Sequence, residues 1–273
     1  MYNKGMIVEL IDGTVANIVD IKNEPISLNI VYLIDKPFGT KYDEKSGYKR
    51  QYYKEGTWFV YPSEIKGVYM EKQEFNYDKV KKAVEDLLIA VGEDPNRPGL
   101  KETPRRVAGY WQELLEGTQY TNREIAEKFN KEFEVGYDPI VTMKIDNLFS
   151  HCEHHLALMF NGSVIIGYVP LETDDGNGYK VLGLSKIPRI VDMCCKRLQL
   201  QEKIASDIAE CISIATGSKQ IYVNLTMDHG CVSARGIKAN SSTNVTFMTT
   251  DLRRNKDARE EFERKALELN SKK

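Results

Sequence analysis

The chain has 273 residues, of which 41% are hydrophobic and 29% are charged, a composition typical of globular proteins. Its formal net charge is −2, so there is no overall positive field to hold a nucleic-acid backbone, and we expect no nucleic-acid partner. No apolar run is long enough to span a bilayer, the N-terminus lacks a signal-peptide pattern, and the five cysteines follow no disulfide spacing. We therefore expect a cytoplasmic protein with reduced thiols and no membrane partner.

Residues 1–74 have a different pattern from the rest of the chain. Short β-rich runs such as "LNIVYLI" and "GTWFVYP" flank the polar, tyrosine-rich stretch "FGTKYDEKSGYKRQYYKEG". They predict a small β-rich N-terminal module, for which a partly open barrel is one arrangement. Its tyrosines are better explained as framework aromatics than as groups that stack on bases. The module carries no catalytic motif, and its role stays unknown.

Helical periodicity begins at "YDKVKKAVEDLLIAVG", where apolar residues recur every three or four positions from Val80 to Val91. A second helix is predicted to begin at Thr103, before Pro104, and to end near Gly117. The runs "IVTMKI" and "SVIIGYVP" are typical of strands, with the "CEHH" cluster in the loop between them. The segment "DDGNGYK" is typical of a hairpin turn.

Two further helices are predicted, one from Ser185 through "KIPRIVDMCCKRLQL" and one, "KIASDIAECISIATG", that ends at Gly217. They should bury Cys194, Cys195 and Cys211 in the core. The runs "QIYVNLTM" and "STNVTFMTT" indicate strands, and a charged helix closes the chain. Because strands and helices come in blocks, the pattern favours an α+β fold with an antiparallel sheet.

The four histidines of the chain fall into two short clusters, and each cluster holds one cysteine. "SHCEHH", residues 150–155, contains three of them, and "DHGC", residues 228–231, contains the fourth. Zinc favours cysteine thiolate and histidine nitrogen, and a catalytic zinc keeps three protein ligands and one open position. Cys152 and His155 are close enough in sequence for one turn to direct both at an ion, and Cys231 could supply the third ligand.

Under that assignment His154 and His229 are free to move protons near a metal-activated water. Two other interpretations fit the same residues: hydrogen-bonded loop histidines without a metal, and a closed structural site with His154 as fourth ligand. The spacing by itself supports a catalytic and a structural zinc about equally.

A second group of residues is positively charged. "GLSKIPRI" places Ser185 at a helix start, where free N–H groups and the helix dipole favour anions. The nearby cations are Lys186, Arg189, Arg235, Arg105 and Arg106. Solvated surface charge explains these residues on their own, but their closeness in sequence to the metal ligands raises the hypothesis of a small, phosphate-bearing substrate.

A third feature is "LQLQEK", which places Gln201 and Glu202 at the break between two helices. A carboxylate at this position favours the dipole of the following helix. It could equally accept paired hydrogen bonds from the N1–H and the 2-amino group of a guanine.

Together these motifs resemble the GTP cyclohydrolase I family. The resemblance covers residues 76–270 and rests on five motifs in the family's order: "GLKETPRRVAGYW", "SHCEHH" followed by "GYVP", "VLGLSKIPRIVDM", "QLQEKIASDI" and "DHGCVSARGI". It implies that residues 75–273 form the catalytic domain and that the zinc is catalytic. It also implies a tunnelling fold, in which an antiparallel sheet with helices on one face joins the sheets of other subunits into a barrel with the helices outside. The family forms homodecamers of two pentamers, with active sites between subunits.

The resemblance also implies a role for each matching residue. The Zn²⁺ ligands would be Cys152, His155 and Cys231, and the catalytic histidines would be His154 and His229. Glu202, with Gln201 beside it, would bind the guanine of GTP. The triphosphate and ribose contacts would be Ser185, Lys186, Arg189, Arg235 and Arg106.

The family's reaction begins when zinc activates a water that adds to C8 of GTP. The imidazole ring opens, formate leaves, and the ribose rearranges to give 7,8-dihydroneopterin triphosphate, a precursor in folate, biopterin or deazaguanine synthesis. The chain departs from the family in its N-terminal module and in longer segments at 156–162 and 171–180. The alternatives are a non-catalytic pterin- or nucleotide-binding paralogue, a nitrile-reducing enzyme of the same fold, and a zinc-stabilised nucleic-acid-binding protein.

Overall fold

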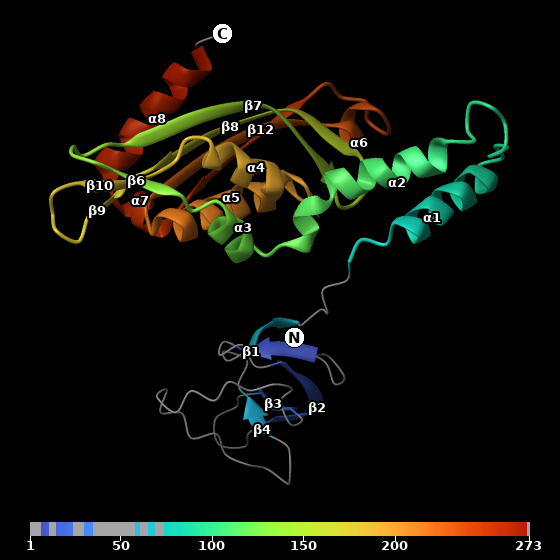
Figure 1. The fold of residues 1–273 in the computed structure, drawn as a ribbon, viewed down its shortest axis with the longest axis horizontal. Coiled ribbons are helices and arrows are strands. Elements are labelled where there is room, and N and C mark those ends of the chain that lie inside the picture. Colours follow the sequence, from blue (N-terminus) through green and yellow to red (C-terminus); the bar gives the residue numbers. More distant parts are fainter. Residues whose placement is uncertain are drawn as a thin grey trace. The chain divides into compact units, whose positions relative to one another are not determined.

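The computed structural model describes residues 74–271 and five strands of the preceding segment, and the chain divides into two compact units, Met1–Glu74 and Phe75–Lys273 (Figure 1). The strands of the first unit are β1 (Ile7–Leu10), β2 (Val15–Asn23), β3 (Ile30–Ile34), β4 (Trp58–Val60) and β5 (Ile65–Val68). They form one antiparallel sheet in the order β4-β3-β2-β1-β5. The tyrosine-rich stretch 38–56 lies outside the described residues.

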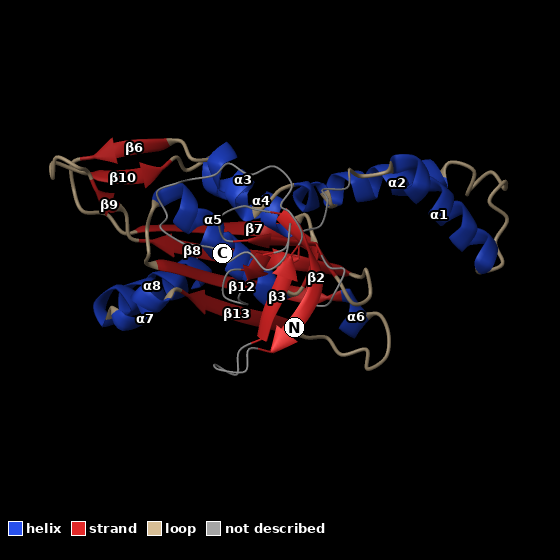
Figure 2. Cartoon of the chain, turned by 90° about the horizontal axis from the view of Figure 1, so that it is seen from below, coloured by secondary structure: helices blue, strands red, loops and turns tan. Residues whose placement is uncertain are grey.

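The second unit is built on a five-stranded sheet in the order β11-β7-β8-β12-β13. Its strands are β7 (Val141–Cys152), β8 (Leu158–Tyr168), β11 (Leu198–Gln199), β12 (Ile221–His229) and β13 (Ser242–Met248). The four long strands lie side by side and pair antiparallel, whereas β11 runs parallel to β7 (Figure 2). The predicted α+β class is confirmed, but the sheet is mixed where an antiparallel one was expected.

Helix α4 (Lys186–Cys195) is shorter than the predicted helix, which wrongly continued to Leu200. The terminal carbonyls of a helix need partners from outside it. Ser150 Oγ donates to the carbonyl of Cys195 at 2.7 Å, and Gln199 Nε2 donates to the carbonyl of Cys194. Because these contacts replace the next turn, the chain leaves the helix and forms β11 beside β7.

Helices pack on both faces of the sheet, whereas helices on one face were expected. Side chains alternate between the two faces along a strand. On β12, Val223 lies in the core formed with α4 and α5 (Gln201–Thr216), whereas the ring of Tyr222 stacks on Phe262 of α8 (Lys256–Ser271) at 5.9 Å. Helix α5 ends as predicted, with Gly217 in the left-handed conformation at φ +68°. The thiols predicted to be core residues are buried: Cys194, Cys195 and Cys211.

The segment before the sheet contains α1 (Tyr77–Ala90), α2 (Thr103–Leu114), the 3₁₀ helix η2 (Glu116–Gln119) and α3 (Asn122–Lys128). The predicted start of α2, with Pro104 in its first turn, is confirmed, but α2 ends before Gly117. Gly117 is buried, and a Cβ at this position would lie 2.0 Å from the carbonyl oxygen of Met193. Close packing against α4, and not helix termination, therefore requires glycine here.

The remaining elements lie at the edges of the second unit. A small sheet, in the order β6-β10-β9, consists of β6 (Glu132–Val135), β9 (Leu171–Glu172) and β10 (Tyr179–Leu182). The turn between β9 and β10 confirms the predicted hairpin. Within this turn, hydrogen bonds from Thr173 and Asn177 lower the pKa of Asp175 to about 2. The short helices are α6 (Gly230–Ser233) and α7 (Thr250–Arg254).

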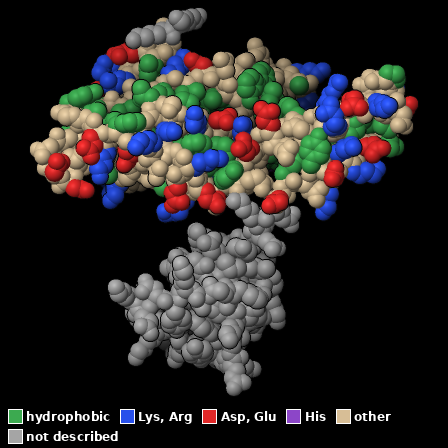
Figure 3. Space-filling model, in the orientation of Figure 1, with side chains coloured by type: hydrophobic (Ala, Val, Ile, Leu, Met, Phe, Trp, Pro, Cys, Tyr) green, Lys and Arg blue, Asp and Glu red, His purple; other side chains and the backbone are tan. Residues whose placement is uncertain are grey.

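The visible face of the second unit carries interspersed acidic and basic side chains, as the formal net charge of −2 suggests (Figure 3). Among the described residues, no helix combines the length and the apolar character that crossing a membrane requires.

A partly buried arginine joins the helices beneath the sheet. Arg197 Nε donates to the carbonyl of Gly117, and Nη2 donates to that of Tyr120, at 3.0 and 2.8 Å. Its Nη1 donates to Asn122 Oδ1 and to Asp207 Oδ2, both at 2.7 Å. The Arg197 and Asp207 side chains are 13% and 2% exposed. The network therefore ties η2, α3 and α5 to the segment between α4 and β11.

We expect Arg197→Met to lower the free energy of unfolding by about 3 kcal/mol, because it leaves the buried Asp207 carboxylate with one cationic partner fewer. Lys203 still contacts Asp207, so the loss of stability should lie at the low end of the range typical of a broken buried ion pair. Denaturant midpoints at equal slope would measure it. The matched control is Lys82→Met, whose exposed pair with Asp86 should contribute nothing measurable. Equal midpoint shifts in the two variants would contradict the role given to Arg197.

Candidate metal centre

The first cluster lies where β7 turns into β8. Cys152 is the last residue of β7, and its carbonyl accepts the backbone N–H groups of His155 at 3.4 Å and Leu156 at 2.9 Å. The Cys152 N–H in turn donates to the carbonyl of Ala157 at 2.9 Å. Both strands extend further than "IVTMKI" and "SVIIGYVP" predicted, so the cluster occupies a tight turn between long, paired strands. This geometry fixes the Cys152 and His155 side chains side by side.

The second cluster reaches the first through strand pairing. His229 is the last residue of β12 and pairs with Met159 of β8, and Cys231 follows in α6. A Cβ on Gly230 would lie 2.9 Å from the carbonyl oxygen of Leu158, so glycine permits the two strand ends to approach this closely. The β8–β12 register therefore carries Cys231 to the β7–β8 turn.

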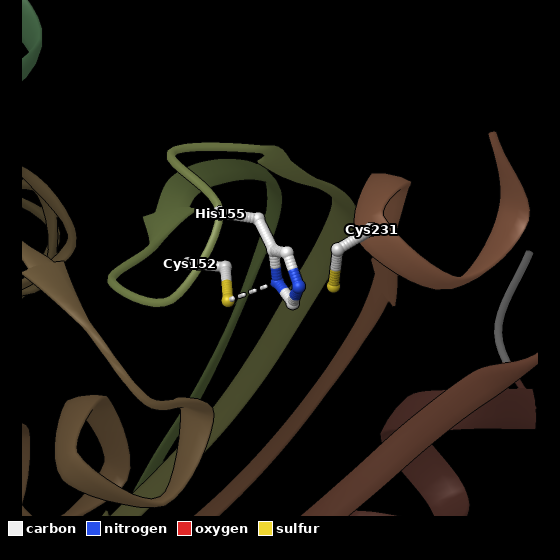
Figure 4. Close-up of side chains that lie close together, drawn as sticks. All are labelled: Cys152, His155 and Cys231. Carbon is white, nitrogen blue, oxygen red and sulfur yellow. Dashed lines mark hydrogen bonds between the residues drawn. The ribbon is translucent and has the colours of Figure 1, made fainter. Parts of the chain in front are cut away.

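Cys152, His155 and Cys231 form a group whose ligand atoms all lie within 4.8 Å of one another. Figure 4 shows the His155 ring between the two sulfurs, with its Nδ1 3.9 Å from Cys152 Sγ. Burial, and then the neighbouring Cys152 thiol, raise the pKa of Cys231. Two thiolates this close repel each other, and a bound cation would relieve that repulsion. The donor set of two thiols and one imidazole is one that holds metal ions.

His154 does not belong to this ligand group. Its Nε2 lies 4.0 Å from the Glu153 carboxylate, and its side chain is 63% exposed. Among the described residues the group contains three donors, which leaves a metal ion with an open position. The geometry therefore does not favour a closed structural site with His154 as fourth ligand.

A cavity of about 280 Å³ adjoins the ligand group. Its walls contain all three ligands together with His154, His229, Gln201 and Glu202. Gln201 and Glu202 open α5, and His229 Nε2 lies 2.8 Å from Gln201 Oε1. The other lining residues are Met159, Gln199, Leu200, Val232 and Thr243. The fold thus brings three of the five sequence motifs to one cavity.

A family model described as GTP cyclohydrolase I matches residues 80–266. The chain belongs to this family. The resemblance inferred from the motifs is confirmed, and the match leaves the N-terminal unit outside.

Proteins named GTP cyclohydrolase 1 are similar to this chain. The one from Clostridium acetobutylicum is 45% identical over 184 residues, which cover 66% of this chain and 91% of the relative. One from Clostridium botulinum (strain Kyoto) is 47% identical over 175 residues, 60% of this chain and 86% of the relative. The one from Clostridium beijerinckii is 43% identical over 188 residues, which cover 64% of this chain and 92% of the relative.

The residues that the GTP cyclohydrolase I resemblance assigns to the triphosphate do not line the cavity of one chain. Ser185 occupies the N-cap position of α4 as predicted, but its side chain makes no capping hydrogen bond. Arg235 lies near enough to Cys231 to oppose slightly the rise in the pKa of that thiol. Lys186 is half-buried, and the other four residues are exposed: Ser185, Arg189, Arg235 and Arg106.

His151 has a different environment from the other three histidines. It is buried, its Nε2 lies 3.0 Å from the Tyr110 hydroxyl, and its ring contacts Trp111. Burial lowers the pKa of His151, so the neutral ring is favoured. His151 therefore packs α2 against β7 and does not line the cavity.

Met159 and Thr243 line the cavity but lie outside the sequence motifs, because strand pairing brings them there. Val232 lies within "DHGCVSARGI" but was given no role, since an apolar side chain carries no distinctive chemistry.

Proposed function

We propose that this protein is a zinc-dependent GTP cyclohydrolase I that hydrolyses GTP at C8, releases formate and forms 7,8-dihydroneopterin triphosphate, the first step of pterin and folate synthesis. One observation supports this function most directly: a single cavity is lined by the metal-ligand group, two further histidines and a carboxylate. The relatives are named GTP cyclohydrolase 1, and the individual steps are those that the family resemblance implies. Because the substrate is a nucleoside triphosphate, we assign the enzyme to the cytoplasm.

Zn²⁺ suits the ligands Cys152, His155 and Cys231, because zinc readily binds two thiolates and an imidazole and keeps a fourth position open. When bound, zinc would supply the Lewis acid that activates water at neutral pH.

His154 and His229 line the cavity without belonging to the ligand group, so neither ring is needed by the metal and each can exchange protons with the substrate. Ring opening, loss of formate and rearrangement of the ribose each require protons to be delivered and removed. Glu202 would accept hydrogen bonds from the N1–H and 2-amino group of guanine and would thereby orient C8 towards the metal. The nearby Gln201 does not need to contact the base.

A homodecamer of two pentamers would complete the barrel of the tunnelling fold and the triphosphate site. Within residues 74–271, β13 ends the large sheet and pairs with β12 alone, which leaves a strand edge to extend. Helix α1 contains no buried residue, and Leu87, Ile89 and Val91 around its C-terminal end are exposed. Apolar surface of this kind favours association. In the assembly, Lys186, Arg189 and the other cationic residues would face the triphosphate.

Purified protein loaded with zinc should release formate from GTP and form a fluorescent pterin, and a chelator should abolish both. The matched comparison is the same preparation with zinc restored after chelation. Binding of GTP without formate release by the zinc-loaded protein would indicate the non-catalytic paralogue instead.

The N-terminal unit should be dispensable for this chemistry, because every proposed site residue lies between Arg106 and Arg235 and the family match begins at residue 80. A chain starting at Asn76 should assemble and release formate at a rate close to that of the full chain. Size-exclusion chromatography and the formate assay would measure this. A shortened chain that folds and binds zinc but lacks activity would show that residues 1–74 contribute to the site or the assembly.

A further inference from the structure

The Gln201 side chain makes three hydrogen-bond contacts within the protein. Gln201 is the first residue of α5 and is 2% exposed. Its terminal amide lies 2.9 Å from the carbonyl oxygen of Leu225 on β12 and 2.9 Å from that of Thr243 on β13. A backbone carbonyl only accepts hydrogen bonds, so the atom that faces both oxygens must be the amide nitrogen. Both N–H groups of Gln201 are therefore donated to the backbone.

This orientation also determines the proton position on His229. With Nε2 of Gln201 directed at the two carbonyls, the amide oxygen faces His229 Nε2 at 2.8 Å. An amide oxygen cannot donate, so His229 Nε2 must carry the hydrogen. The neutral imidazole then has its lone pair on Nδ1, which has no hydrogen-bond partner among residues 74–271. A flipped amide would bring oxygen against two carbonyl oxygens.

Three elements hold the amide in place. Helix α5 supplies Gln201, the buried interior of β12 supplies the Leu225 carbonyl, and β13 supplies the Thr243 carbonyl. Both donors are used, the amide oxygen already faces His229, and the side chain is 2% exposed, so Gln201 has no free donor and little access to guanine. The role that the sequence motif gave to Gln201, a direct substrate contact, therefore does not fit its geometry.

We propose that Gln201 is a positioning residue, which fixes the ring orientation and tautomer of His229 so that His229 exchanges protons with the substrate through Nδ1. This inference rests on the proposed function and adds the atom through which one of its histidines acts. Glutamine suits the task better than glutamate, because a carboxylate would have no hydrogen to donate to Leu225 and Thr243.

Solid-state ¹⁵N NMR of histidine-labelled, zinc-loaded protein would read the tautomer directly. The chain has four histidines, so the His229 signals are identified by their loss in His229→Ala. We expect a hydrogen-bonded Nε2–H and an unprotonated Nδ1, and both tautomers in Gln201→Met. A neutral His229 with its hydrogen on Nδ1 in the unsubstituted protein would overturn the proposal. This result requires no turnover, so it stays separate from a failure of the proposed function.

Kinetics with a double-mutant cycle would test whether Gln201 acts through His229. Gln201→Met should lower kcat for formate release by about tenfold to a hundredfold, with KM for GTP changed by less than about twofold. In the His229→Ala protein, the same substitution should cause no further loss of turnover and no loss of GTP affinity. Weaker GTP binding in both backgrounds would mean that Gln201 contacts the substrate and would overturn the proposal.

If Gln201 had a purely structural role, its substitution would lower the stability and the zinc content of the protein but would leave kcat per folded, zinc-loaded chain unchanged. That result would also overturn the proposal. Gln201→Glu provides a second variant, because it keeps an acceptor for His229 and loses both donors. It should retain a larger share of kcat than Gln201→Met when both are normalised to zinc-loaded protein.

Discussion

Alanine substitution of Cys152, His155 or Cys231 should remove the bound metal from the protein. Each residue contributes one of three donor atoms that lie within 4.8 Å of one another, so each substitution deletes a direct bond to the ion. His154 and His229 lie outside the ligand group, and their alanine variants should keep about one zinc ion per chain. Metal analysis of the five purified variants measures this difference.

The same variants should separate metal binding from proton transfer. His154→Ala and His229→Ala should lose formate release by about 10²–10⁴-fold while they keep zinc, because general acid–base help is typically of that size. Cys195→Ala is a matched control, since it removes a buried thiol of α4 that does not line the cavity and should keep both zinc and activity.

Two outcomes would contradict this assignment. Zinc loss in His154→Ala with zinc retained in His155→Ala would mean that the ligand is the other histidine of the pair. Zinc loss in both, together with full activity of His229→Ala, would indicate a structural metal site and would exclude the catalytic interpretation.

Glu202→Gln should lower kcat/KM for GTP by roughly thirtyfold to several hundredfold. The substitution keeps the shape of the side chain but turns one acceptor into a donor that faces the donors of guanine. We expect this loss of a charge-assisted hydrogen bond to cost about 2–4 kcal/mol. The preference for GTP over inosine triphosphate, which lacks the 2-amino group, should narrow. Steady-state kinetics with both nucleotides measures the two effects.

Glu210→Gln provides the control for Glu202→Gln. Glu210 is an exposed carboxylate of the same helix that contacts Asn122 and does not line the cavity. It should leave kcat/KM and zinc content unchanged. Near-normal GTP turnover in Glu202→Gln would remove Glu202 from the guanine pocket.

The pattern of residues was sufficient to predict much of the second unit. Helix α1, the start of α2 at Thr103, the end of α5 at Gly217 and the 171–180 hairpin follow from local signals, since caps, turns and apolar periodicity act over a few residues. The types of metal ligand could also be predicted from the sequence, because thiolates and imidazoles have a specific affinity for metal ions.

Contacts between distant parts of the chain set the rest. The segment "KRLQL" favours a helix locally, yet α4 ends at Cys195 because Ser150 and Gln199 satisfy its last carbonyls. Cys231 joins Cys152 through the register of β8 and β12, which no spacing within either motif encodes. Gln201 was expected to bind the substrate together with Glu202, and only the fold places its amide against carbonyls on two strands. Local chemistry thus names the groups that can react, whereas strand pairing and packing determine which of them meet, because hydrogen bonds between distant segments form only in the folded chain.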